Sequence, residues 1–143
     1  MDLRRLLAPQ SVAFIGGRIA EMTIRRCQQL GFAGEIMPVH PARQSLAGFQ
    51  CYPTLESLPQ VPDAAYVGVN RDLTVDIVAR LAAMGAGGCV CYAAGFAEIG
   101  GEGQAYQDRL VEADGKLRVR ACEARADVGH ALRAEVRAVR HPK

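Results

Sequence analysis

The sequence predicts an α/β domain with an open, doubly wound and mainly parallel sheet that has helices on both faces. Four short segments are apolar with little alternation, as buried strands are: residues 11–15, 35–39, 64–69 and 89–92. Helical apolar patterns lie between these segments. Fifteen glycines among 143 residues fit many tight turns between strands and helices. Strands that are continuously apolar are typical of a parallel sheet covered on both sides, and right-handed crossovers then give a Rossmann-like arrangement.

The chain begins with a predicted βαβ unit. A short amphipathic helix, indicated by Leu3, Leu6 and Leu7, is expected to pack on the edge of the sheet before the first strand. The first strand stops at Gly16 and Gly17, where a longer helix begins. The expected inner face of this helix consists of Ile19, Met22, Thr23, Cys27 and Leu30, whereas its outer face holds Glu21, Arg25 and Arg26. A left-handed cap at Gly31 would end it before the second strand, residues 35–39.

The remaining elements repeat the alternation of strand and helix. Residues 48–53 predict a turn with a brief extended piece, and Thr54 is expected to cap a single helical turn. After the strand at 64–69, Asp72 is expected to cap a helix whose inner face holds Leu73, Ile77, Val78, Leu81 and Met84. The strand at 89–92 precedes a predicted helix over 103–113 and a fifth strand over 117–119.

The glycine turn at Gly16–Gly17 is the first candidate for chemistry. It joins a buried strand to a helix, and in a parallel sheet this places the first N–H groups of the helix at the carboxyl edge of the sheet. A diphosphate can bind such N–H groups, and glycine lets the backbone approach it without interference from a Cβ. Arg18 and Arg43 can add charge-assisted hydrogen bonds to phosphate oxygens.

Composition limits the classes of function. The length and the hydrophobic content of 50% allow one domain with a real core. The longest apolar runs fall far short of the roughly 20 residues that span a bilayer, and the N-terminus lacks a secretory signal pattern. Five cysteines without a disulfide-framework spacing favour a reducing cytoplasmic setting. Cys89 and Cys91 share one face of a strand, and we interpret them as small buried side chains rather than as metal ligands.

The overall charge of +2 conceals an asymmetry. Residues 1–115 hold nine basic and twelve acidic residues, whereas residues 116–143 hold eight and three, a net charge of +5. A basic tail can bind nucleic acid, but no aromatic residues are interleaved with these arginines and no RNA- or DNA-binding motif is present. The sequence therefore argues against a nucleic-acid partner and against a membrane partner.

Four segments occur in an order that is typical of one family: residues 7–13 (LAPQSVA), 31–34 (GFAG), 38–41 (PVHP) and 94–98 (AGFAE). The chain resembles the N-terminal, Rossmann-like CoA-binding domain of NDP-forming (ADP-forming) acyl-CoA synthetases, which are related to the succinyl-CoA synthetase α subunit. The resemblance covers about residues 3–119. It implies that coenzyme A, or an acyl-CoA, lies across the carboxyl edge of the sheet.

The resemblance also implies which residues contact the coenzyme. The turn and the phosphate-contacting loop would consist of Gly16, Gly17, Arg18, Ile19, Ala20 and Glu21. The end of the second strand would contribute Val39, His40, Pro41 and the basic Arg43. A further loop would contribute Val69, Asn70 and Arg71, and the segment along the pantetheine would be Tyr92, Ala93, Ala94 and Gly95. Two alternatives stay open: His40 either stacks on adenine or simply ends a strand, and Arg71 either contacts the ligand or is a solvated residue.

The chain departs from the family pattern in three places. Its first loop is short, His40 stands where the family usually has Asn, and the Gly-Pro-Asn-Cys segment expected after residue 119 is missing. We therefore divide the chain into a CoA-binding domain, residues 1–119, and a basic tail, residues 120–143, which resembles a frameshifted or truncated end. The family's phosphohistidine domain and ATP-grasp domain have no counterpart in this sequence. We therefore expect a module that is not catalytically complete, and we name no catalytic residue.

Two other functions remain open. An NAD(P)-binding oxidoreductase fragment would share the glycine turn, but such enzymes usually place an acid at the end of the second strand, and here that place holds Val39, His40 and Pro41. An inactive regulatory or interaction subunit would explain the short first loop and the altered tail. Expected partners are other synthetase domains or subunits, and a second copy of the chain if an exposed sheet edge recruits one.

Overall fold

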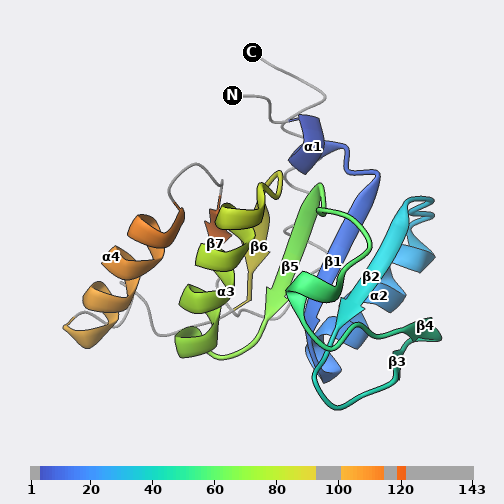
Figure 1. The fold of residues 1–143 in the computed structure, drawn as a ribbon, viewed down its shortest axis with the longest axis horizontal. Helices are drawn as coiled ribbons and strands as arrows, with labels where there is room; N and C mark the ends of the chain where they lie inside the picture. The colour runs from blue at the N-terminus through green and yellow to red at the C-terminus, as the bar shows by residue number, and fades with distance from the viewer. Residues whose placement is uncertain (1–3, 93–100, 115–118, 122–143) are drawn as a thin grey trace.

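The computed structural model describes residues 4–92, 101–114 and 119–121, and it contains the predicted parallel sheet (Figure 1). The five strands of this sheet lie in the order β2-β1-β5-β6-β7, and every neighbouring pair is parallel. Their bounds are Ser11–Gly16 for β1, Glu35–Val39 for β2, Ala64–Gly68 for β5, Cys89–Cys91 for β6 and Val119–Ala121 for β7. The order reverses at β1, which pairs with β2 on one side and β5 on the other.

Four of the five predicted strands are confirmed within one residue. The fifth strand was expected over 117–119, but β7 runs over Val119–Ala121, so it continues past the boundary at 119 that the sequence predicts for the domain. Residues 117 and 118 lie outside the described residues. The division of the chain into a domain and a tail stays a prediction.

Helices cover both faces of the sheet. Alternate residues of each strand belong to two separate core clusters, as the period of a strand requires. Phe14 and Tyr66 pack on one face with α2 (Arg18–Gln29), whereas Ala13, Ile15 and Val67 pack on the other face with α3 (Arg71–Met84) and α4 (Glu102–Asp114). The doubly wound architecture expected from the continuously apolar strands is confirmed.

The predicted inner faces of two helices were wrong in part. On α2 the buried residues are Ala20, Thr23 and Ile24, whereas Met22 and Leu30 are 53% and 57% exposed. On α3, Thr74 is buried and its neighbour Leu73 is 51% exposed. The apolar stripe is therefore turned by about one residue from the expected one. Small or hydroxylated residues face the sheet where helix and strands approach closely, and the hydroxyls of Thr23 and Thr74 are satisfied by helix carbonyls.

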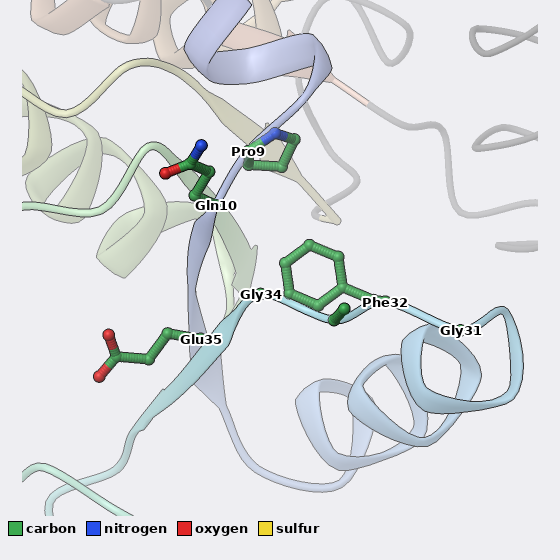
Figure 2. Close-up of a pocket in the computed structure, with 7 residues that line it drawn as sticks. Pro9, Gln10, Gly31, Phe32, Gly34 and Glu35 are labelled. Atoms are coloured by element: carbon green, nitrogen blue, oxygen red, sulfur yellow. The ribbon is translucent and has the colours of Figure 1, made fainter.

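The end of α2 follows the predicted left-handed cap. Gly31 has a φ of +79°, and its N–H donates to the Gln28 carbonyl while the Phe32 N–H donates to the Cys27 carbonyl. These two bonds form a Schellman motif. The chain then enters β2 beside a shallow groove at the amino edge of the sheet (Figure 2). The groove is lined by Pro9, Gln10, Gly31, Phe32, Ala33, Gly34 and Glu35.

A small hairpin follows β2, where the sequence predicted only a turn and an extended piece. Strands β3 (Ser45–Leu46) and β4 (Phe49–Gln50) pair antiparallel. Ala47 and Gly48 between them both have positive φ, of 51° and 85°. Two consecutive positive φ values form the two-residue turn that matches the twist of a hairpin. Alanine rarely adopts this conformation, and the sequence signal for the turn was therefore weak.

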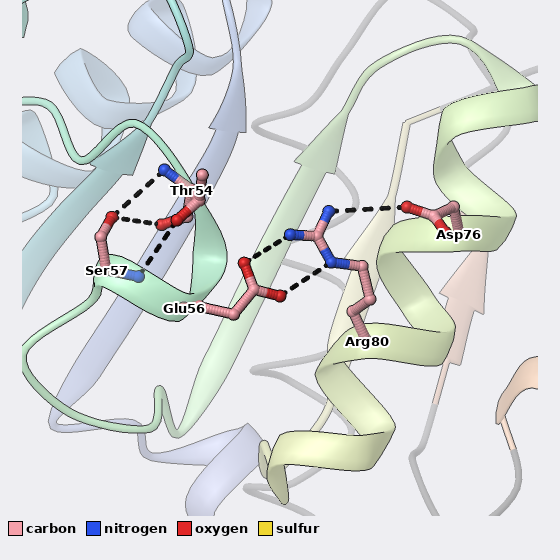
Figure 3. A network of polar contacts seen from close by, with 5 residues as sticks. All are labelled: Thr54, Glu56, Ser57, Asp76 and Arg80. Atoms are coloured by element: carbon pink, nitrogen blue, oxygen red, sulfur yellow. Dashed lines mark hydrogen bonds and ion pairs between the residues drawn. The ribbon is translucent and has the colours of Figure 1, made fainter.

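A 3₁₀ turn, η1 (Leu55–Ser57), begins at the predicted cap Thr54 (Figure 3). The Thr54 hydroxyl accepts from the Ser57 N–H, and the Ser57 hydroxyl accepts from the Thr54 N–H, both at 3.2 Å. The turn is linked to α3 because the Glu56 carboxylate accepts from Nε and Nη2 of Arg80, at 2.9 and 2.5 Å. This contact positions η1 over the same face of the sheet as α3.

The short helix α1 (Arg4–Leu7) is fastened to the amino edge of the sheet by Arg5. The Arg5 Nε donates to Oδ1 of Asp63 at 2.9 Å, and its Nη1 donates to the Gly85 carbonyl at 3.0 Å. The other carboxylate oxygen of Asp63 accepts from the Gln10 N–H at 2.9 Å. Asp63 directly precedes β5. Its carboxylate therefore joins the start of β5 to α1 and to the residue before β1.

Asp63 makes the stability of the fold depend on acidity. The Arg5 side chain, followed by the Gln10 N–H, lowers the pKa of Asp63, so its charged form stabilises the folded state. This stabilisation is complete above the unfolded pKa of about 3.9 and is lost as the pH falls through the lower folded value. At neutral pH we expect Asp63→Asn to lower the free energy of unfolding by about 1 kcal/mol. Urea unfolding at neutral pH and at about pH 2 would measure the effect.

The control for this prediction is Asp76→Asn on the surface of α3. Asp76 pairs with Arg80 at 3.5 Å and is mostly exposed, so the change should alter stability by less than about 0.5 kcal/mol at either pH. The difference between wild type and Asp63→Asn should shrink in acid. An equal difference at both pH values would contradict the role assigned to the Asp63 charge.

Candidate functional site

The candidate site is built where the carboxyl ends of β1 and β5 meet. Gly16 ends β1 with a φ of +135°, and a Cβ added to it would lie 2.4 Å from the Gly68 carbonyl oxygen. The two backbones therefore approach too closely for any side chain at residue 16. Because the strand order reverses at β1, this contact lies at the switch point, where ligands bind in open α/β sheets.

The N-terminus of α2 opens directly onto this switch point. Gly17 is the N-cap and supplies no side-chain hydrogen bond, and the first backbone bond of the helix runs from the Glu21 N–H to the Gly17 carbonyl at 2.9 Å. The N–H groups of Arg18, Ile19 and Ala20 thus precede the first helical bond. Together with the positive end of the helix dipole, they suit an anion.

The N-terminus of α3 differs, because its own side chain caps it. The Asn70 Oδ1 accepts from the Leu73 N–H at 3.0 Å, so the cap predicted at Asp72 was wrong and the cap lies two residues earlier. Asp72 lies in the first turn of the helix and accepts a hydrogen bond from the Tyr106 hydroxyl instead. Of the two helices that begin beside the switch point, α2 is the one whose first N–H groups lack such a cap.

His40 reaches this region from the end of β2. Its Nδ1 accepts from the N–H groups of Ala42 and Arg43, at 3.0 and 2.9 Å. Its other ring nitrogen, Nε2, lies 3.8 Å from the position that a Cβ on Gly17 would occupy. The structure therefore brings His40 to the glycine turn. The two flanking residues of the predicted site differ: Val39 is buried in the core, whereas Pro41 is exposed.

Arg43 also reaches α2, and it meets a carboxylate there. The Arg43 Nη1 lies 3.3 Å from Oε2 of Glu21, and Arg25 lies 3.0 Å from the other oxygen of the same group. The Arg25 hydrogen bond, with a smaller effect of Arg43, lowers the pKa of Glu21. Glu21 is thus ionised at neutral pH and joins the loop after β2 to the first turn of α2.

Arg71 contacts α4. Its guanidinium lies 4.1 Å from the ring centroid of Tyr106 and 3.3 Å from a carboxylate oxygen of Glu102, both on α4. The Arg109 guanidinium lies 4.2 Å from the same ring. The Arg71 side chain is 25% exposed and contacts α4, and its contact with a ligand stays a prediction. Val69, just before the Asn70 cap, is half-buried against the core on the α3 face.

Tyr92 follows β6 and continues its pairing. Its N–H donates to the Val67 carbonyl at 2.9 Å, and its half-buried ring lies 6.4 Å from that of Tyr66 on the α2 face. The other predicted members of this segment, Ala93, Ala94 and Gly95, lie outside the described residues. The structure therefore places Tyr92 at the end of β6, with β5 between it and β1.

The four cysteines within the described residues form no disulfide bond. Cys89 and Cys91 are fully buried, and their sulfur atoms lie 3.9 Å apart on one face of β6. Burial raises the pKa of the Cys27 and Cys51 thiols, which keeps them protonated at neutral pH. Within the described ranges, His, Cys, Asp and Glu side chains form no group of three that could hold a metal ion.

With this geometry established, comparison with known proteins identifies the family. The CoA binding domain family matches residues 10–127. The chain belongs to this family. The match begins one residue before β1 and extends past β7, so it contains the glycine turn, His40 and Arg43.

The curated relatives are much longer than the chain. A trans-feruloyl-CoA synthase of an unknown prokaryotic organism is 39% identical over 114 residues, which are 76% of this chain and 16% of that protein. The ADP-forming acetate–CoA ligase II of Archaeoglobus fulgidus is 34% identical over 116 residues, 78% of this chain and 17% of that protein. The chain thus spans about one sixth of these relatives and corresponds to their N-terminal CoA-binding domain.

A solved structure agrees on the fold. The dinucleotide-forming acetyl-coenzyme A synthetase 1 of Ca. Korarchaeum cryptofilum, in complex with phosphate and ADP, superposes with a TM-score of 0.76 at 26% identity. The superposition covers 85% of this chain and 27% of that one. The Rossmann-like fold and the predicted family are therefore both confirmed.

Every helix within the described ranges is too short or too polar to cross a bilayer.

Two features of the site escaped the sequence interpretation. The first is Gly68, whose carbonyl closes on Gly16; its only signal was a glycine at the end of the strand over 64–69. The second is the contact of Glu21 with Arg43, which joins residues 22 positions apart and left no pattern in the sequence. Both depend on which strands are neighbours, and periodicity does not reveal that.

Proposed function

We propose that the chain binds coenzyme A across the carboxyl edge of the sheet, with the diphosphate against the first N–H groups of α2. The observation that carries the proposal is the uncapped glycine turn at Gly16–Gly17, which lies at the switch point of a chain that belongs to the CoA binding domain family. A diphosphate there would interact with backbone N–H groups and with the helix dipole at once.

The proposal gives separate roles to the residues around the turn. Arg18 and Arg43 would hold phosphate oxygens, and Val69 and Asn70 would line the path of the ligand. Tyr92, with Ala93, Ala94 and Gly95, would lie along the pantetheine chain. Arg71 would act through α4 rather than by contact with the ligand, because its side chain packs on Tyr106.

The proposal also includes a part in acyl-CoA synthesis. A bound coenzyme would be presented to other domains or subunits of an ADP-forming acyl-CoA synthetase, which would supply acyl activation. One relative is named as the alpha subunit of ADP-forming acetate–CoA ligase I, from Pyrococcus furiosus, at 26% identity. We propose a cytoplasmic setting and such synthetase partners for this chain. Self-association stays a prediction.

Calorimetric titration with CoA, dephospho-CoA and NAD would test the proposal. Binding of CoA is the expected result, and a preference for CoA over dephospho-CoA would indicate that basic side chains hold the additional phosphate. Binding of NAD alone would overturn the proposal in favour of a nicotinamide enzyme. Binding of none of the three would favour an interaction subunit whose ligand site is vestigial.

Arg43→Ala is expected to weaken CoA binding by about 1.5–3 kcal/mol, the range for a hydrogen bond to a charged group. The reason is that the Arg43 guanidinium lies within reach of α2, as its contact with Glu21 shows. Titration calorimetry at low salt would measure the change, since screening at high salt would reduce it.

Two variants on α2 serve as comparisons. Arg26→Ala removes the same charge from an exposed residue whose guanidinium donates to the Gln29 side chain, and it should leave CoA affinity unchanged. Glu21→Gln removes the carboxylate that pairs with Arg43 and should tighten binding. Equal affinities of wild type and Arg43→Ala would remove Arg43 from the site.

A further inference from the structure

The ring of His40 is held in one orientation by the backbone that follows it. Its Nδ1 accepts two hydrogen bonds, from the N–H groups of Ala42 and Arg43, at 3.0 and 2.9 Å. A nitrogen that accepts two hydrogen bonds carries no proton of its own. In the neutral ring the single proton is then on Nε2, and the two hydrogen bonds to Nδ1 oppose rotation of the ring.

The Nε2 atom of His40 lies beside the glycine turn. Nε2 is the nearest atom to the empty Cβ position of Gly17, at 3.8 Å, and no hydrogen bond joins it to another of the described residues. His40 is neither buried nor fully exposed. A fixed N–H donor therefore lies beside the first N–H groups of α2, where an anion would accept hydrogen bonds from both.

We propose that His40 is a fixed hydrogen-bond donor to the diphosphate of the bound coenzyme and that it helps to select ligands with an anion at the glycine turn. The inference rests on the proposed CoA site and adds a residue role to it. It differs from both interpretations left open by the sequence, because the ring atom nearest to Gly17 is the nitrogen Nε2.

The two ring nitrogens can be tested separately. In His40→Asn, the side-chain oxygen can take the place of Nδ1 and accept from the N–H groups of Ala42 and Arg43, as Asn does in turns. The amide NH2 of Asn is one bond from Cγ, so it does not extend as far as Nε2 of the histidine ring does. We expect this variant to keep the wild-type melting temperature and to bind CoA about tenfold more weakly or worse. His40→Phe keeps an aromatic ring and should lose affinity at least as strongly.

A second ligand and NMR spectroscopy complete the test. Dephospho-CoA retains the diphosphate, so His40→Asn should lower the affinities for CoA and for dephospho-CoA by the same factor. Nitrogen-15 NMR spectra of the wild type should show the Nε2–H tautomer of His40, and this signal should shift on addition of CoA. The chain has only three histidines, which simplifies the assignment of the signals. Undiminished affinity in His40→Asn or in His40→Phe would overturn the inference, as would a loss confined to CoA.

These outcomes are distinct from a failure of the proposed function. If the wild-type chain binds no CoA, the site itself is wrong. If the wild type binds CoA and His40→Asn binds it equally well, the site stands and only the role of His40 is wrong.

Discussion

Gly16→Ala is expected to lower the free energy of unfolding by about 2–6 kcal/mol, from the sum of backbone strain and overpacking. A φ of +135° is rare for any residue with a Cβ, and the added carbon would lie 2.4 Å from the Gly68 carbonyl oxygen. Backbone cannot move aside as a flexible side chain can. Either β1 and β5 separate at the switch point or the strain is retained. Urea unfolding followed by circular dichroism would measure the loss.

The matched control is Gly85→Ala. Gly85 caps α3 with a φ of +81°, and a Cβ there would meet nothing within 4 Å. This variant should cost only the left-handed strain, about 1–2 kcal/mol. If Gly16→Ala were no more destabilising than Gly85→Ala, the close approach of the two strands would be contradicted. Where Gly16→Ala still folds, its CoA affinity should fall more than that of Gly85→Ala.

Leu81→Ala is expected to destabilise the fold by about 2–5 kcal/mol. Leu81 lies on α3, is fully buried, and packs in the core between α3 and the sheet. Removal of its side chain leaves a cavity that rigid strands can fill only in part. Thermal and chemical unfolding would both report the loss.

Leu73→Ala is the control for Leu81→Ala, because it removes the same atoms from the same helix. Leu73 is 51% exposed, so its truncation should cost less than about 1 kcal/mol. The pair also tests the helix orientation. Similar losses for the two variants would mean that α3 presents the face that the sequence predicted, with Leu73 against the sheet.

The strands could be predicted and the helix faces only in part, for a physical reason. A strand buried on both faces must be apolar at nearly every residue, so its sequence identifies it without knowledge of its neighbours. A helix that packs closely on a sheet can bury Ala20, Thr23 or Thr74 and leave Met22 or Leu73 in solvent. Side-chain size then misleads, because the space between layers decides which residues fit.

In the candidate site, too, some features could be predicted from the sequence and others could not. The glycine turn and Arg43 could be found from local sequence and from the family resemblance. The ion pair of Arg43 with Glu21, and the packing of Arg71 on Tyr106, join segments that are distant in the chain. The two-residue turn with positive φ at Ala47 escaped because alanine normally avoids that conformation. Such contacts follow from the order of the strands, and only the folded chain defines that order.

The stacked arrangement around Tyr106 has a mechanical consequence. The Tyr106 ring on α4 contacts the guanidinium groups of Arg71 and Arg109, and its hydroxyl donates to Asp72. These contacts join α4 to Arg71 and Asp72, which begin α3 just after β5. The start of α3 and the helix α4 are therefore expected to move together as one unit.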